Sequence, residues 1–131
     1  SGWKMPKEKM TARIIKALEN PYVDILDHPT GRLINKREAF DIDIEKILKA
    51  AKKNNKILEI NANPERLDLK DSHIKAAIEH RVKLAICTDA HDISNLDFML
   101  YGVAEARRGF AEKKDIINTL SYDKLASYFK R

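Results

Sequence analysis

The feature that most constrains the fold is a regular alternation of short apolar runs with segments of helical periodicity. The apolar runs cover residues 23–26, 57–60 and 84–87, and polar turn residues follow each of them. The helical segments are expected at residues 6–19, after Asp41, from Asp71, at about 95–108 and after Ser121. This order predicts an α/β fold in which short, mostly apolar strands form a buried parallel sheet through right-handed crossovers.

Capping and periodicity support the helical segments. Pro6 suits a first helical turn, and Asp41, Asp71 and Ser121 are good N-caps for later helices. Gly109 is expected to end the fourth helix. Three parallel strands form only a small sheet, whose edges need cover. We therefore expect an isolated chain of this kind to associate or to remain partly disordered.

Length and composition exclude several classes of protein. The 131 residues make one domain, and no apolar run approaches the ~18 residues of a membrane span. The first residues lack the apolar stretch that is typical of a signal peptide. A single cysteine, Cys87, excludes an internal disulfide and fits a reducing compartment, so a cytoplasmic location is expected.

Charge is distributed unevenly along the chain. The net charge is +5, with 25 lysines and arginines against 20 acidic residues. Residues 1–20 and 101–131 each carry a net charge of +3, whereas the middle of the chain carries −1. Basic ends are compatible with a polyanionic partner, and equally with solvated lysine-rich helix faces.

The ends of the three predicted strands carry the candidate chemistry, since parallel α/β folds place their sites at the carboxyl ends of strands. His28 follows the first strand, and Asp89 and His91 follow the third. Two imidazoles and a carboxylate suit Mn²⁺, Fe²⁺ or Zn²⁺. The alternative is that these side chains only cap turns or form hydrogen bonds.

Other polar residues have weaker signals. Arg32 and Arg66 each follow a strand end and could hold a phosphate, although single arginines more often form surface ion pairs. His73 and His80 lie on the third predicted helix, where a structural role near solvent is expected. Cys87 is expected to be a buried small apolar residue.

Five segments in order resemble one known family. They are His28–Arg32 (His-Pro-Thr-Gly-Arg), Leu58–Ala62 (Leu-Glu-Ile-Asn-Ala), Arg66–Leu69 (Arg-Leu-Asp-Leu), Thr88–His91 (Thr-Asp-Ala-His) and Tyr101–Gly109 (Tyr-Gly-Val-Ala-Glu-Ala-Arg-Arg-Gly). Together they resemble the PHP (polymerase and histidinol phosphatase) domain, in the version found at the C-terminus of bacterial and archaeal family-X DNA polymerases.

The resemblance implies a distorted (βα)7 barrel that hydrolyses phosphate esters at a multi-metal cluster. In the polymerases this is a Mn²⁺-dependent 3′–5′ exonuclease that processes DNA 3′ ends. His28, Asp89 and His91 match family metal ligands and would be catalytic, while Arg32 or Arg66 would hold phosphate. The expected metal is Mn²⁺ or Zn²⁺, with Mg²⁺ as the alternative.

Departures from the family limit this expectation. The family's His-x-His motif and several later ligands are absent, and Ser1-Gly2-Trp3 resembles the sequence that follows the last of them. Asp27 and Cys87 replace residues that are smaller in the family. Residues 1–131 are thus expected to be the C-terminal half of a PHP domain, partnered by its other half and a polymerase core. Alone, they should bind one metal weakly and hydrolyse little.

Two other functions remain open at this point. One is a small-molecule phosphatase of the histidinol-phosphatase type. The other is a non-catalytic module that binds DNA or docks to a partner.

Overall fold

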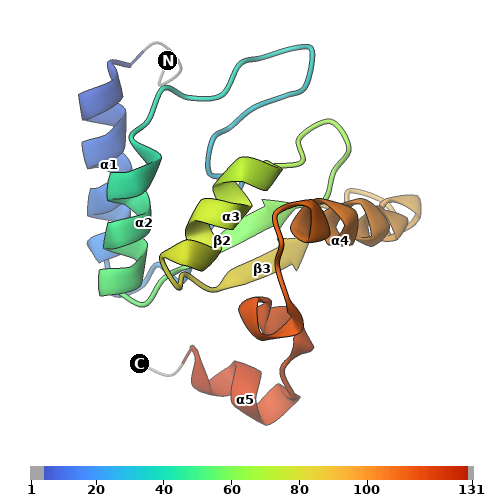
Figure 1. The fold of residues 1–131 in the computed structure, drawn as a ribbon. Coiled ribbons are helices and arrows are strands. Elements are labelled where there is room, and N and C mark those ends of the chain that lie inside the picture. Colours follow the sequence, from blue (N-terminus) through green and yellow to red (C-terminus); the bar gives the residue numbers. More distant parts are fainter. Residues whose placement is uncertain (1–4, 130–131) are drawn as a thin grey trace.

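Three parallel strands form the centre of the molecule. The computed structural model describes residues 5–129 and contains one sheet of order β1-β2-β3, with β1 at Ile25–Leu26, β2 at Ile57–Asn61 and β3 at Leu84–Cys87 (Figure 1). The pairing is parallel throughout. The α/β prediction is therefore confirmed, while a closed barrel is not seen in residues 5–129. The predicted Ser1-Gly2-Trp3 match lies outside the described residues.

Helices and short 3-10 turns connect and flank these strands. The α-helices are α1 (Lys7–Glu19), α2 (Ile44–Lys53), α3 (Asp71–Glu79), α4 (Met99–Arg108) and α5 (Tyr122–Ser127). The 3-10 turns are η2 (Ile93–Phe98), η3 (Lys113–Asp115) and η4 (Ile117–Thr119). Gly109 ends α4 and Ser121 caps α5, as predicted.

Three predicted helix starts were wrong in detail. Asp43, not Asp41, caps α2, and its carboxylate accepts a hydrogen bond from the Lys46 amide at 3.2 Å. Asp71 is the first residue of α3 rather than its cap. The segment expected as one helix over 95–108 begins as the 3-10 turn η2, where the Asp92 carboxylate accepts hydrogen bonds from the amides of Ser94 and Asn95.

The sheet is covered on both faces, as alternation of strand side chains requires. On one face, Leu58, Ile60, Leu84 and Ile86 pack with the apolar stripes of α1 to α4 into the main core. On the other face, Ile57 and Ala85 pack against Ile117, and Leu120, Leu125 and Phe129 lie at the margin of this smaller core. The C-terminal segment thus covers the face of the sheet that α1 to α4 do not cover.

The outer edge of β3 is also occupied. Residue Ile116 forms a parallel bridge with Leu84. The Asn118 side chain accepts from the Ile86 amide and donates to the Ile86 carbonyl, both at 2.8 Å. The amide side chain therefore satisfies backbone groups that a neighbouring strand would otherwise pair. The expectation of open sheet edges is wrong at this position. No helix within residues 5–129 is long and apolar enough to cross a membrane.

Candidate functional site

The carboxyl ends of the three strands are joined by a chain of hydrogen bonds. The His28 amide, just after β1, donates to Glu59 Oε1 at 2.7 Å. The Asn61 amide side chain, at the end of β2, donates to the same Glu59 oxygen and to Asp89 Oδ2, each at 3.1 Å. Asp89 follows β3. The structure therefore brings His28 and Asp89 to one edge of the sheet, as parallel strands predicted.

Both strand-end residues have unusual backbone conformations. His28 has φ 27° and Asp89 has φ 54°, in the left-handed region that non-glycine residues seldom adopt. Such conformations cost on the order of 1–3 kcal/mol each and concentrate at functional sites. Here Glu59 holds the His28 amide and Asn61 holds the Asp89 carboxylate. The fold thus maintains strain at two of the three predicted ligand positions.

His91 lies at the surface, in the turn that follows β3. Its side chain is 81% exposed, and its Nδ1 lies 2.7 Å from the carbonyl oxygen of Asp89. A carbonyl only accepts hydrogen bonds, so Nδ1 carries the proton and Nε2 keeps its lone pair in the neutral ring. The carboxylate of Asp89 is close by, with Oδ1 4.0 Å from His91 Nδ1. These two residues present one imidazole nitrogen and one carboxylate at the same turn.

The donor types fit a divalent transition metal, but the structure does not assemble a complete ligand set. Among residues 5–129, no group of three or more histidine, cysteine, aspartate or glutamate side chains is arranged to hold a metal ion. Asp89 and His91 lie at the same turn, and His28 joins the same edge of the sheet through its backbone. The metal role of these three residues stays a prediction.

Arg66 lies beside this edge. Its Nε is 3.6 Å from Asp89 Oδ2, and its side chain is 19% exposed. Its Nη1 is buried and has no hydrogen-bond partner among the described residues. A buried guanidinium nitrogen without a partner is costly unless a ligand supplies an acceptor. Arg66 is therefore the better placed of the two predicted phosphate-binding arginines.

Arg32 has a different local role. Its Nε donates to the Arg66 carbonyl at 2.7 Å, and its Nη2 donates to the Leu67 carbonyl. These bonds tie the loop after β1 to the loop after β2. The nearby Asp68 carboxylate interacts with the charge of Arg32 and compensates part of it.

A second buried carboxylate, Asp68, also holds the loop after β1. Its Oδ2 accepts from the amides of Thr30 and Gly31 at 3.0 and 2.9 Å, and its Oδ1 accepts from Thr30 at 3.2 Å. Asp68 is 0% exposed, and burial raises its pKa despite these donors. Sequence reasoning gave Asp68 no role, because its partners lie 37 and 38 residues away.

Acidic residues set the electrostatics of the site. Burial raises the pKa of Glu59, and the nearby Asp27 adds to this effect. Burial and then Glu59 raise the pKa of the Cys87 thiol to about 12. Cys87 is therefore protonated at neutral pH, which supports its interpretation as a packing residue rather than a thiolate ligand.

Comparison with known proteins shows similarity to a DNA polymerase and to several probable phosphatases. The chain is 44% identical over 131 residues to the DNA polymerase/3′-5′ exonuclease PolX of Bacillus subtilis, a match that covers 100% of the chain and 23% of that protein. It is 35% identical over 132 residues to a probable phosphatase of Thermoanaerobacter sp. (strain X514), covering 94% of the chain and 50% of the relative. A probable phosphatase of Caldanaerobacter subterraneus is 29% identical over 132 residues. No family model matches the chain.

The chain spans half the length of the Thermoanaerobacter phosphatase and about a quarter of the polymerase. Both kinds of relative match nearly all of it, so the resemblance is not limited to the five motifs. The polymerase match is the stronger in identity and includes every residue of the site described above. The chain is therefore similar over its whole length to one part of a PolX-type DNA polymerase/3′-5′ exonuclease and to one half of a probable phosphatase.

Proposed function

We propose that this chain forms the C-terminal half of the phosphoesterase unit of a PolX-type protein. The whole protein hydrolyses phosphodiester bonds at DNA 3′ ends. The observation that carries the proposal is the set of hydrogen bonds that links the carboxyl ends of the three strands. There Glu59 and Asn61 link the His28 backbone to the Asp89 carboxylate, beside an imidazole whose Nε2 is left for ligation. Similarity of the whole chain to part of a DNA polymerase/3′-5′ exonuclease supports the choice of DNA as the substrate.

The proposed roles follow from these contacts. Asp89 and His91 hold a divalent metal, with His28 as a further ligand from the neighbouring strand end. Mn²⁺ or Zn²⁺ is the expected ion, with Mg²⁺ as the alternative. When bound, the metal supplies Lewis acidity and activates water. Arg66 Nη1 donates to a non-bridging phosphate oxygen, while its Nε keeps the Asp89 carboxylate in place.

The proposal includes partners for the chain. The remaining half of the domain supplies further ligands, and a polymerase core presents the DNA. The rest of the relatives' length, beyond the part that this chain matches, is consistent with such partners. A cytoplasmic location belongs to the same proposal.

A second candidate is a phosphatase that acts on small phosphate monoesters. It is favoured by the 35% identity to the probable phosphatase of Thermoanaerobacter, whose length is twice the matched region. The same edge residues would serve in that case, and the difference would lie in how the rest of the substrate is bound. A non-catalytic DNA-binding module is the third candidate.

A chimera tests the proposal directly. The matching segment of the Bacillus subtilis PolX would be replaced by this chain, and degradation of a 3′-labelled oligonucleotide would be measured with Mn²⁺. We expect exonuclease activity that falls by more than about 100-fold in His91→Ala, because metal ligands carry the chemistry. His80→Ala is the matched control, since the His80 ring bonds to the Ala76 carbonyl and to Glu45, away from the carboxyl ends of the strands.

Each alternative predicts a different outcome. A folded chimera that turns over phosphate monoesters but not DNA would favour the small-molecule phosphatase. Salt-sensitive DNA binding without any turnover would favour the binding module. The isolated chain should hydrolyse DNA negligibly, and robust activity there that His91→Ala abolishes would show that the chain alone completes the site.

A further inference from the structure

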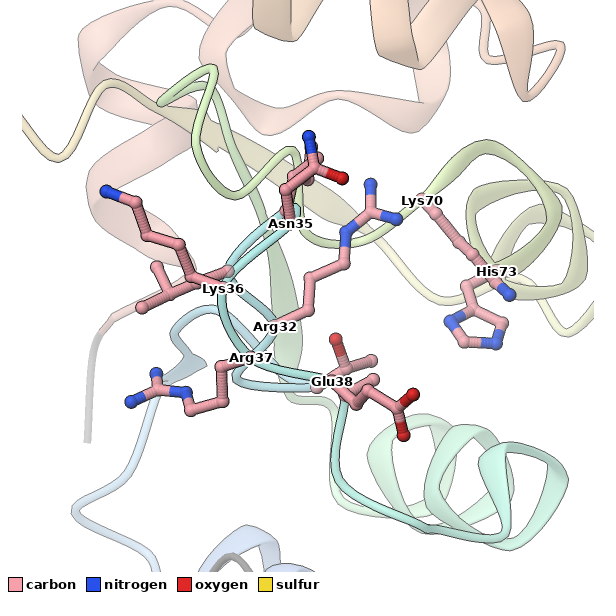
Figure 2. Close-up of a pocket in the computed structure, with 11 residues that line it drawn as sticks. Arg32, Asn35, Lys36, Arg37, Glu38, Lys70 and His73 are labelled. Atoms are coloured by element: carbon pink, nitrogen blue, oxygen red, sulfur yellow. The ribbon is translucent and has the colours of Figure 1, made fainter.

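A large hollow lies between the loop after β1 and the start of α3 (Figure 2). Its volume is about 630 Å³. The lining comes from one continuous loop and from two residues of the next crossover: Thr30, Arg32, Leu33, Ile34, Asn35, Lys36, Arg37, Glu38 and Ala39, with Lys70 and His73. Residues 31 to 43 positions apart in sequence (from Ala39 to Lys70 and from Thr30 to His73) therefore build one concave surface.

The charge of this hollow is predominantly positive. Four cationic side chains line it, against the single carboxylate of Glu38. Arg37 donates from Nε and Nη2 to the Gly31 carbonyl, and Arg32 donates to two other carbonyls. These carbonyl partners fix both guanidinium groups, and the Asp68 carboxylate lies close enough to Arg32 to compensate part of its charge. Lys36 pairs with Glu65 at 3.1 Å, but both side chains are exposed and such pairs are weak.

His73 lines this hollow from α3. It is half-buried, and its Nδ1 is buried without a hydrogen-bond partner among the described residues. Burial lowers the pKa of His73, and the charges of Lys70 and Arg32 lower it further. The ring is therefore neutral at pH 7 and can exchange a hydrogen bond with a bound ligand. Figure 2 shows Arg32, Lys70 and His73 on the same side of the loop.

A second hollow of about 470 Å³ adjoins the first and shares Arg32 and Lys70 with it. Its lining adds Tyr101 and Arg108 from α4. Tyr101 is 51% exposed, and Arg108 pairs with Asp71 at the surface. The second hollow is also lined by Asp71 and Glu105, so its excess of positive charge is small and comes from the shared Arg32 and Lys70. Cationic groups beside an exposed aromatic ring are the combination that binds single-stranded nucleic acid.

We propose that the two hollows together bind a single-stranded stretch of polynucleotide. Arg32 and Lys70 contact a phosphate, His73 hydrogen-bonds within the first hollow, and a base stacks on Tyr101 in the second. This inference deepens the proposed function and rests on it for the identity of the substrate. It also gives a physical reason why a protein of this kind would prefer a polymer to a small phosphate monoester.

The test measures binding of this chain to a fluorescent oligothymidylate by anisotropy, in EDTA, over a range of salt concentrations. Tyr101→Leu should weaken binding about tenfold, since one stacked base is worth about 1–3 kcal/mol. Lys70→Gln should reduce the magnitude of the log–log salt slope by about 0.7, the loss expected for one phosphate contact to a single strand. Tyr122→Leu and Lys49→Gln are matched controls, because both residues are exposed and line neither hollow.

NMR of the histidine rings gives a second measurement, which uses the unsubstituted protein and so does not depend on whether a variant folds. Addition of the oligonucleotide should shift the His73 ring signals and leave those of His80 in place, since His80 is already bonded to the Ala76 carbonyl and Glu45. Inorganic phosphate at equal concentration should shift His73 much less, because it cannot reach both hollows.

Three results would overturn the inference. Equal salt slopes for Lys70→Gln and Lys49→Gln would exclude a phosphate contact at Lys70. Equal affinity for polyglutamate would show that only net charge is recognised. Binding of inorganic phosphate as tight as that of the oligonucleotide would reduce the site to a single anion. Because EDTA removes the metal, these results are independent of hydrolysis. A chimera that binds DNA through the two hollows but does not hydrolyse it would contradict the proposed function and leave this inference intact.

Discussion

Removal of the Asp68 carboxylate should destabilise the protein strongly. Asp68→Ala leaves the amides of Thr30 and Gly31 without acceptors, in a region where both residues are buried. Each orphaned buried donor costs about 1–3 kcal/mol, and water entering the vacated space offsets part of this. We expect a loss of about 3 kcal/mol in the free energy of unfolding, or about 10 °C in Tm for a domain of this size.

Asp68→Asn is the informative control. Both amides donate to Oδ2, so the asparagine oxygen can replace that atom, and only the 3.2 Å contact of Oδ1 with the Thr30 amide is lost. The cost should be about 1 kcal/mol. Urea unfolding followed by circular dichroism measures both variants. The reasoning is refuted if Asp68→Ala stays within about 0.5 kcal/mol of the parent, or if the asparagine costs as much as the alanine.

The difference in stability between the parent and Asp68→Asn should change with pH in a defined direction. Burial raises the pKa of Asp68 in the folded protein, so the native state takes up this proton at a higher pH than the unfolded chain does. As the pH falls from 7 towards the ordinary range of an aspartate, the parent should therefore gain stability relative to Asp68→Asn. A difference in stability that stays constant over this range would contradict the assigned direction.

Three further predictions concern other elements. Asn118→Ala should lower the free energy of unfolding by about 1–2 kcal/mol in urea titrations, because both backbone groups of Ile86 lose their partner; an equal cost for Lys49→Ala, at an exposed position of α2, would contradict this reason. Gly102→Ala should destabilise by about 1–3 kcal/mol, since its new methyl would lie 2.5 Å from Ile86 Cγ2, and an unchanged Tm would show that the helix shifts freely. Cys87, with its pKa raised to about 12, should react with iodoacetamide at pH 8 far more slowly in the native protein than in urea, and equal rates would contradict its protonated state.

The sequence predicted the elements well where local pattern decides them. The strands lie within two residues of the apolar runs, because polar turn residues bound each run. The predicted N-cap of α2 was wrong because Asp41 and Asp43 are equally good caps by local sequence. A tertiary contact decides between them: the Asp43 amide donates to Thr11 Oγ1 on α1 at 2.9 Å. Local sequence contains no trace of this hydrogen bond.

The candidate site was predictable in position but not in construction. Parallel strands alone place His28 and Asp89 at one edge. The contacts that hold them there join residues 28 to 38 positions apart, so no local pattern indicates them. The hollow beside α3 was missed for a related reason: charge was counted along the chain, while Lys70 and the loop after β1 meet only in the fold.

The loop that carries His28 depends on the second strand as much as on the first. Its amides at His28, Thr30 and Gly31 all donate to carboxylates, one from Glu59 within β2 and one from Asp68 just beyond it. Burial raises the pKa of both carboxyl groups more than these donors lower it, so keeping them ionised costs stability at neutral pH. A loop held by two costly buried acceptors is fixed more firmly than packing alone requires. That rigidity is what a ligand position at a left-handed residue needs, because a metal–ligand bond tolerates only about 0.2 Å of displacement.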